Sequence, residues 1–248
     1  IWQPDKWTDG NDRKELKMRR ISLGYEYLAR IVMMIVVVNI AIIVHTLFGL
    51  VAAGFFPSIS AAYSTYRRWI LSVDDRSWSI TKTWKVFFHE WKSDFVGANV
   101  FGWIQFVVWA ALLWEYWFVQ QNNLGQMGFA VSGILLVLNI IYILFVLESW
   151  AIRSHFNERA GWIIRTTFTM ILVRPICTFF VLVVVLLVGF AYYKWPGLMV
   201  ACGISIPIFT TMMCIYSWGK LPSMDIHQIE PLEDDLKKRH QTDVNDQQ

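Results

Sequence analysis

Long uninterrupted apolar runs constrain this chain more than any other feature of its sequence. A helix needs about 20 consecutive apolar residues to cross about 30 Å of hydrocarbon. Four runs reach that length, at residues 31–53, 97–119, 129–148 and 197–217. A fifth run, at 175–192, is slightly shorter and rich in Val, Leu and Phe. An aqueous surface would not tolerate such runs. They predict an all-α polytopic membrane bundle.

The composition agrees with a membrane protein and excludes a nucleic-acid-binding protein. Only 17% of the residues are charged, against about 25% in an ordinary soluble domain. The net charge of +3 is small, and no basic run is interleaved with aromatic residues, so nucleic-acid binding is excluded. Three cysteines fall inside apolar runs, where we expect inert apolar side chains: Cys177, Cys202 and Cys214.

A sixth segment, Phe55–Leu71, is ambiguous by hydropathy alone. It begins near Pro57 and holds four Ser or Thr residues before Arg67 and Arg68, which favours a loop or a re-entrant turn. If it crosses, however, 21 of the 22 Lys and Arg residues lie on one side of the membrane, as the positive-inside rule requires. We therefore predict six crossings, the second short and Pro-led, with both termini cytoplasmic in the cell membrane. At 1.5 Å per residue, this second helix spans only about 25 Å.

The same pattern divides the chain into three regions. We expect a basic cytoplasmic N-terminal segment at 1–30, a transmembrane bundle at 31–218 and a flexible cytoplasmic tail at 219–248. Two connectors, 80–99 and 151–173, carry aromatic and basic residues at helical spacing. They predict cytoplasmic amphipathic helices in the inner interface, with rings toward lipid and cations toward headgroups.

Three ionisable residues inside or at the ends of the runs are candidate intramembrane polar groups: His45, Glu115 and Arg174. Asn39 lies six residues before His45, too far round the helix to share its face. No spacing forces any pair together, so a proton relay has no support. Motifs for metal, phosphate or nucleophile chemistry are absent from the sequence, which predicts no enzyme, no metal and no cofactor.

Two linked motifs carry a family resemblance. The segment PSISAAY at 57–63, followed by RRW at 67–69, resembles the P-x-x-x-A-x-Y-x-x-x-R-x-W segment of the YesL family of bacterial membrane proteins. The segment FFHEWKSDF at 87–95, followed by Ala98 and Asn99, resembles the FF-x-x-(F/W)K-x-x-F element of that family. One departure is Gly54-Phe55-Phe56, where the family has Thr-x-Gly before the proline.

The resemblance implies a context rather than a reaction, because the family has no settled biochemical activity. Its members are typically encoded beside carbohydrate uptake and breakdown systems in Gram-positive bacteria, often with ABC importers and sensors. It implies an accessory membrane protein of oligosaccharide uptake that docks a transporter or sensor component, and a homo-oligomer is compatible with this role. The candidate docking or structural motif comprises Pro57, Tyr63, Arg67, Arg68, Trp69, Phe88, Trp91, Lys92, Phe95 and Asn99.

Two functional alternatives and one structural alternative stay open. The chain could be a small permease or channel with a cavity around Pro57, Tyr63 and Glu115, and a membrane enzyme ranks last for lack of catalytic groups. The structural alternative is that Pro57 starts a helix, Tyr63 packs across the bundle, and the basic residues of the motif anchor headgroups.

Overall fold

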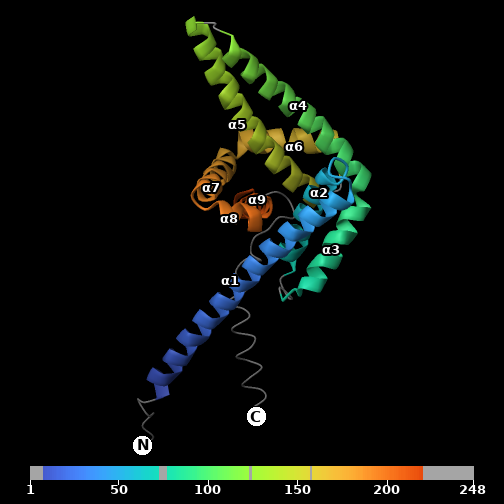
Figure 1. Cartoon of the computed structure of the whole chain (residues 1–248). Helices are drawn as coiled ribbons and strands as arrows, with labels where there is room; N and C mark the ends of the chain where they lie inside the picture. The colour runs from blue at the N-terminus through green and yellow to red at the C-terminus, as the bar shows by residue number, and fades with distance from the viewer. Residues whose placement is uncertain (1–7, 73–76, 123–124, 157, 220–248) are drawn as a thin grey trace, which may run out of the picture.

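The computed structural model describes residues 8–72, 77–122, 125–156 and 158–219, with side chains from residue 25 onward. Regular structure in these ranges is entirely helical, as predicted (Figure 1). The helices are α1 (Thr8–Phe48), α2 (Phe55–Leu71), α3 (Ile80–Ser93), α4 (Phe95–Gln121), α5 (Gly125–His155), α6 (Ala160–Val173), α7 (Pro175–Lys194), α8 (Pro196–Cys202) and α9 (Ser205–Trp218). Residues 1–7 of the predicted N-terminal segment and residues 220–248 of the predicted tail lie outside the described residues. Helix α1 runs without a break across the predicted boundary between residues 30 and 31.

Four of the described helices are long and apolar enough to cross a membrane: Tyr25–Phe48 within α1, then α4, α5 and α7. The pair α8 and α9 makes a fifth span if it counts as one, although the two helices are bent by 74°. The polytopic helical class is thus supported, whereas six crossings are not confirmed, because α2 is not among these candidates. The run predicted at 197–217 is broken rather than continuous.

The turn between α1 and α2 is unusually tight. Leu50 and Val51 both have positive φ, at 57° and 63°. A Cβ on Gly49 would lie 2.2 Å from the Cα of Gly54, so only glycine permits the two ends to meet. The Asn99 side-chain amide donates to the Ala53 carbonyl at 2.8 Å. The start of α4 therefore lies beside this turn. The chain runs away from the turn along α2 and comes back to it along α3.

Helix α2 forms the centre of the molecule. Ten of its 17 residues are buried, and it contacts α1, α3, α4, α5 and α9. Its small side chains at Ser58, Ala62 and Thr65 are fully buried, which lets neighbouring helices approach closely. A short helix with this many polar groups is thus enclosed by protein.

Helix α3 differs from its predicted form in two respects. The predicted helix at 80–99 breaks at Asp94, whose backbone leaves the helical region before α4 begins. The rings expected to face lipid pack instead on α1, because His45 lies within 5.0 Å of the Phe87 ring and 5.3 Å of the Trp84 ring, centroid to centroid. The expectation of lipid-facing rings is therefore wrong for Phe87, which is fully buried, while Phe88 is exposed.

Helices α4 and α5 form a long hairpin whose far half projects beyond the other helices (Figure 1). Both helices are apolar on all sides, and little of their most apolar stretches is buried within the chain, 22% for α4 and 17% for α5. Helix α5 also continues to His155, so the connector predicted at 151–173 becomes a helix only from Ala160. Such a hairpin can bury its surface only against lipid or another protein.

The break between α8 and α9 is held by side chains of other helices. The Asn39 amide donates to the Val200 carbonyl, and its oxygen accepts from the Ile204 N–H, both at 3.2 Å. The Tyr192 hydroxyl donates to the carbonyl oxygens of Cys202 and Gly203 at 3.1 and 3.0 Å. Interrupted backbone in an apolar bundle needs such partners, and these four bonds supply them.

Candidate functional site

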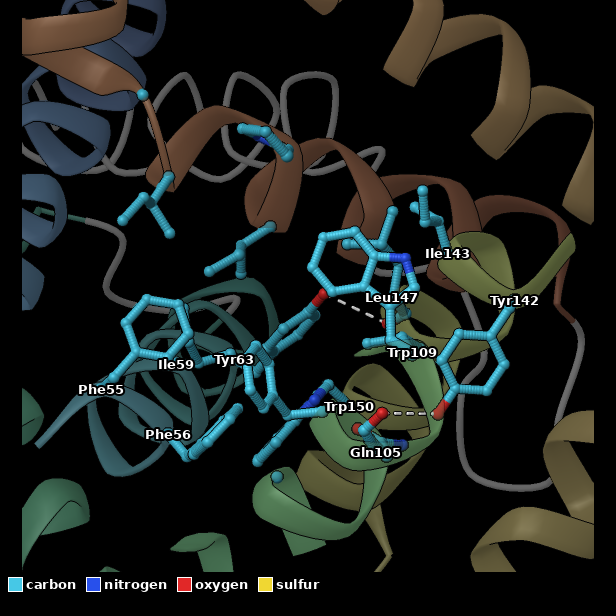
Figure 2. A pocket seen from close by; sticks show the side chains of 17 residues that line it. Phe55, Phe56, Ile59, Tyr63, Gln105, Trp109, Tyr142, Ile143, Leu147 and Trp150 are labelled. Atoms are coloured by element: carbon cyan, nitrogen blue, oxygen red, sulfur yellow. Dashed lines mark hydrogen bonds between the residues drawn. The ribbon is translucent and has the colours of Figure 1, made fainter. Parts of the chain in front are cut away.

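A cavity of about 390 Å³ lies between α2, α4, α5 and the α8–α9 break (Figure 2). Aromatic rings from three helices form much of its wall. They belong to Phe55, Phe56, Tyr63, Trp109, Tyr142 and Trp150. The Phe56 ring fits against α4 only because residue 102 is glycine, since a Cβ there would lie 2.2 Å from that ring. Close helix approach thus shapes one side of the cavity.

Several polar groups of the wall are bonded to protein, whereas Gln105 Oε1 and Trp109 Nε1 are buried without a hydrogen-bond partner. The Tyr63 hydroxyl donates to the Leu147 carbonyl at 3.1 Å. The Tyr142 hydroxyl donates to the Gln105 backbone carbonyl at 2.9 Å (Figure 2). The Gln105 side-chain amide donates to the Ser149 hydroxyl at 2.8 Å. What faces the cavity is therefore almost wholly carbon.

An apolar space of this size is costly to leave empty. Carbon atoms of the wall that face empty space lose the dispersion contacts that a packed neighbour would supply, so a cavity of about 390 Å³ favours an occupant. Water suits most of this space poorly, because a buried water needs two to four polar partners and the wall is mainly carbon. The cavity suits an apolar occupant.

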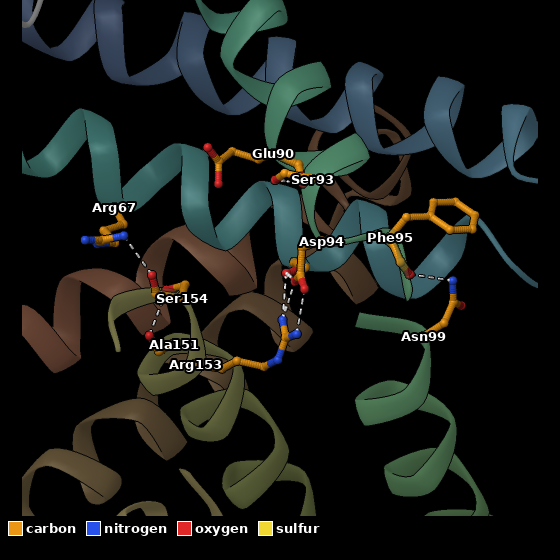
Figure 3. A network of polar contacts seen from close by, with 10 residues as sticks. Arg67, Glu90, Ser93, Asp94, Phe95, Asn99, Ala151, Arg153 and Ser154 are labelled. Carbon is orange, nitrogen blue, oxygen red and sulfur yellow. Dashed lines mark hydrogen bonds and ion pairs between the residues drawn. The ribbon is translucent and has the colours of Figure 1, made fainter. Parts of the chain in front are cut away.

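A polar network lies below the cavity at the break between α3 and α4 (Figure 3). The Arg153 guanidinium donates to both carboxylate oxygens of Asp94, one of them at 2.8 Å, and Ser60 donates to Asp94 at 2.6 Å. The Arg153 Cζ also lies 5.4 Å from the Phe101 ring and 5.5 Å from the Trp150 ring. This geometry joins α2, α4 and α5 by a paired charge, with the guanidinium also close to two rings.

Two basic residues of α2 also bind to other helices of the chain. The Arg67 guanidinium donates to the Ser154 carbonyl at 3.0 Å (Figure 3). Arg68 forms an ion pair with Glu90 of α3. Both residues thereby connect the C-terminal end of α2 to a neighbouring helix.

Residues in the first half of the predicted docking motif are mainly buried and pack against other helices. Pro57, Tyr63 and Trp69 are buried, and the Trp69 ring lies 6.3 Å from that of Tyr27 and 6.2 Å from that of Phe209. These positions match the structural alternative for the motif.

In the second half of the motif, some residues pack within the protein and others are exposed on its surface. The Trp91 ring lies 5.0 Å from the Phe95 ring and 5.5 Å from that of His45, and Asn99 holds the α1–α2 turn. Phe88 and Lys92 are exposed on α3.

The three predicted intramembrane polar residues lie apart. His45 is buried among rings of α3, and its Nδ1 donates to the Ala41 carbonyl at 2.8 Å. Glu115 is exposed on α4, and Arg174 lies at the junction of α6 and α7. Among the described residues, no hydrogen bond or ion pair joins any two of the three. Nor is any group of three or more His, Cys, Asp or Glu side chains in that part of the chain placed to hold a metal ion.

Asp94, Arg153 and Glu148 are not among the site residues predicted from the sequence, although Glu148 is an ionisable residue at the inner end of a predicted crossing. Glu148 is fully buried between α5 and its neighbours, and neither carboxylate oxygen has a hydrogen bond of normal geometry, although the Thr178 hydroxyl is its neighbouring polar group. An acid at the end of an apolar run is a signal that could have indicated it. Nothing local indicates the Asp94–Arg153 pair.

Fold and site together define a multi-pass α-helical membrane protein, with an apolar cavity and polar groups that tie its helices together. Residues 35–116 match the family DUF624, described as a protein of unknown function. Over 164 residues the chain is 25% identical to the Uncharacterized protein YesL of Bacillus subtilis (strain 168), which covers 66% of this chain and 74% of that protein. No solved structure matches the chain. Both matches support membership in the YesL family, which the two motifs resemble.

Proposed function

We propose that this protein is an accessory integral membrane protein of bacterial carbohydrate uptake, which docks a transporter or sensor component. In this proposal it is not itself an enzyme and carries no cofactor. It resides in the cell membrane with both termini in the cytoplasm, an orientation supported by 21 of 22 basic residues falling on one side in the six-crossing arrangement.

The carbon lining of the cavity is the observation that carries the proposal. A sugar-conducting site needs hydrogen-bond partners for many hydroxyl groups. The hydroxyls of Tyr63 and Tyr142 are instead committed to backbone carbonyls, and the Gln105 amide to Ser149. An accessory role requires no such pathway through the chain.

A surface suited to docking lies on α3. We name as the α3 surface the exposed residues Lys85, Phe88, His89 and Lys92. An exposed ring among basic groups is typical of interface hot spots, and its charge is complementary to an acidic face on a partner. The partner in this proposal is therefore a transporter or sensor component with an acidic contact face.

Site-specific photocrosslinking in native membranes tests this assignment. A photoreactive phenylalanine replaces Phe88, and a matched control replaces Trp114, which is exposed on the projecting half of α4. In cells grown on oligosaccharide, we expect position 88 to capture a transporter or sensor subunit and position 114 not to. Capture of lipid alone, or of a second copy of this chain, would contradict the proposed partner.

One observation favours the alternative of a small permease. Helices α8 and α9 are bent by 74° at a break held by Asn39, and broken helices are common at transport sites. Purified protein in vesicles distinguishes the two functions. Oligosaccharide uptake by this chain alone would favour the permease, whereas uptake only with a co-purified importer would favour the accessory role.

A further inference from the structure

We propose that the cavity between α2, α4, α5 and the α8–α9 break binds an acyl chain of a bilayer phospholipid. This inference concerns a ligand, and it stands whether or not the protein docks a transporter. It assigns to the cavity a structural lipid that completes the packing of the bundle.

The mouth of the cavity is continuous with the lipid-facing surface. The cavity is open on one side, and Phe55, Phe106 and Ile143, which line it, are 39%, 44% and 39% exposed. Two of these residues lie on α4 and α5, which are candidate membrane spans. A chain from the surrounding bilayer can therefore enter sideways without crossing a polar barrier.

The size of the cavity excludes a helix of a partner protein. One helical turn, about 10 Å wide and 5.4 Å long, already occupies roughly 420 Å³. The whole cavity measures about 390 Å³ and is lined by residues of α2, α4, α5, α9 and the α8–α9 break. A flexible methylene chain fits where a helix does not.

The chemistry of the wall selects the tail of the lipid rather than its headgroup. None of the residues that line the cavity is charged, and Arg153, whose Cζ lies 5.5 Å from the Trp150 ring, is bonded to Asp94. No free charge is thus directed at the mouth from this network. We expect binding to depend on the acyl chain and to be the same for phosphatidylglycerol and phosphatidylethanolamine.

The test uses full-length protein in vesicles that contain either phospholipid with a diazirine in the middle of one acyl chain. Val146→Trp fills the cavity from α5, since Val146 lines it. Val137→Trp is the matched control, because Val137 is an exposed residue of the same helix that does not line the cavity. After irradiation, labelled peptides are identified by mass spectrometry, and lipid retained through detergent purification is quantified.

In the wild type, we expect strong labelling of the peptides around residues 55–59 and 142–147, equal for both headgroups. Val146→Trp should lose most of this labelling and its retained lipid, and Val137→Trp should keep both. Unchanged labelling in Val146→Trp would overturn the proposal, as would labelling no stronger than on the projecting half of α4. If Val146→Trp fails to fold, Ile143→Trp at the mouth replaces it under the same criteria.

Discussion

Arg153 of α5 donates to both carboxylate oxygens of Asp94, and this pair fastens α5 to the point where α3 ends and α4 begins. The two residues are 59 positions apart in the sequence. Ser60 donates to the same carboxylate, so one ion pair connects the central helix α2 with both sides of the α4–α5 hairpin. The pair is only partly exposed, with 16% of the Arg153 side chain and 34% of that of Asp94 accessible.

Removing one partner of this ion pair should destabilise the protein strongly. Breaking a buried pair costs about 3–5 kcal/mol, and partial exposure here reduces the expected loss for Asp94→Asn to about 2–3 kcal/mol. Thermal unfolding in detergent measures it. The control is Arg30→Gln, which removes a more exposed pair with Glu26 on the same helix and should cost at most about 1 kcal/mol. Equal effects of the two substitutions would contradict the structural importance of Asp94.

Asn39→Leu should loosen the break between α8 and α9. It leaves the Val200 carbonyl and the Ile204 N–H without their partner, which costs about 1–3 kcal/mol for each buried group left unpaired. The melting temperature of the purified protein should fall. Asn122→Ala is the control, because its exposed bond to the Phe118 carbonyl can be replaced by water. A melting temperature unchanged in Asn39→Leu would show that the break does not depend on Asn39.

Gly102→Ala should destabilise the contact between α2 and α4. The added Cβ would lie 2.2 Å from the Phe56 ring, and overpacking of this kind costs about 1–3 kcal/mol. Gly133→Ala, in α5, meets nothing within 4 Å and should be neutral or stabilising, by up to about 1 kcal/mol. Adding Phe56→Leu to Gly102→Ala should restore part of the stability. Failure of this rescue would argue against the ring contact as the cause.

Glu148→Gln should leave the protein as stable as the wild type or more stable. A fully buried carboxylate without a normal hydrogen bond is costly when charged, and the amide has the same shape without the charge. Unfolding measured at neutral pH tests this expectation, with Glu115→Gln as the exposed control that should change nothing. A marked loss of stability in Glu148→Gln would mean that the carboxylate is bound to a cation or partner in the membrane.

Cysteine labelling tests the orientation that the basic residues favour. In a variant without the three native cysteines, Lys85→Cys should resist an impermeant reagent applied to intact cells, and Lys194→Cys should react. Both lysines are exposed. Reaction at position 85 would instead place α3 outside, with α2 and α3 as a re-entrant pair that returns to the α1–α2 turn.

Much of the helical architecture could be derived from local sequence. In a bilayer, backbone groups must be bonded within the same segment, so each long apolar run has to become a helix. The spans in α1, α4, α5 and α7 follow from this rule, and the residues of α2 were bounded correctly as Phe55–Leu71. The family resemblance came from two short motifs, and both lie within residues 35–116, the part of the chain that matches the family DUF624.

The packing partners required the folded chain, because side-chain contacts between helices have no local signal. His45 is the only ionisable residue of the apolar run at 31–53, and the position of α3 surrounds it with rings. Asn39 meets Ile204 across 165 positions, and Asp94 meets Arg153 across 59. Hydropathy and periodicity describe each helix alone, whereas the cavity and the ion pair exist only where separate helices converge.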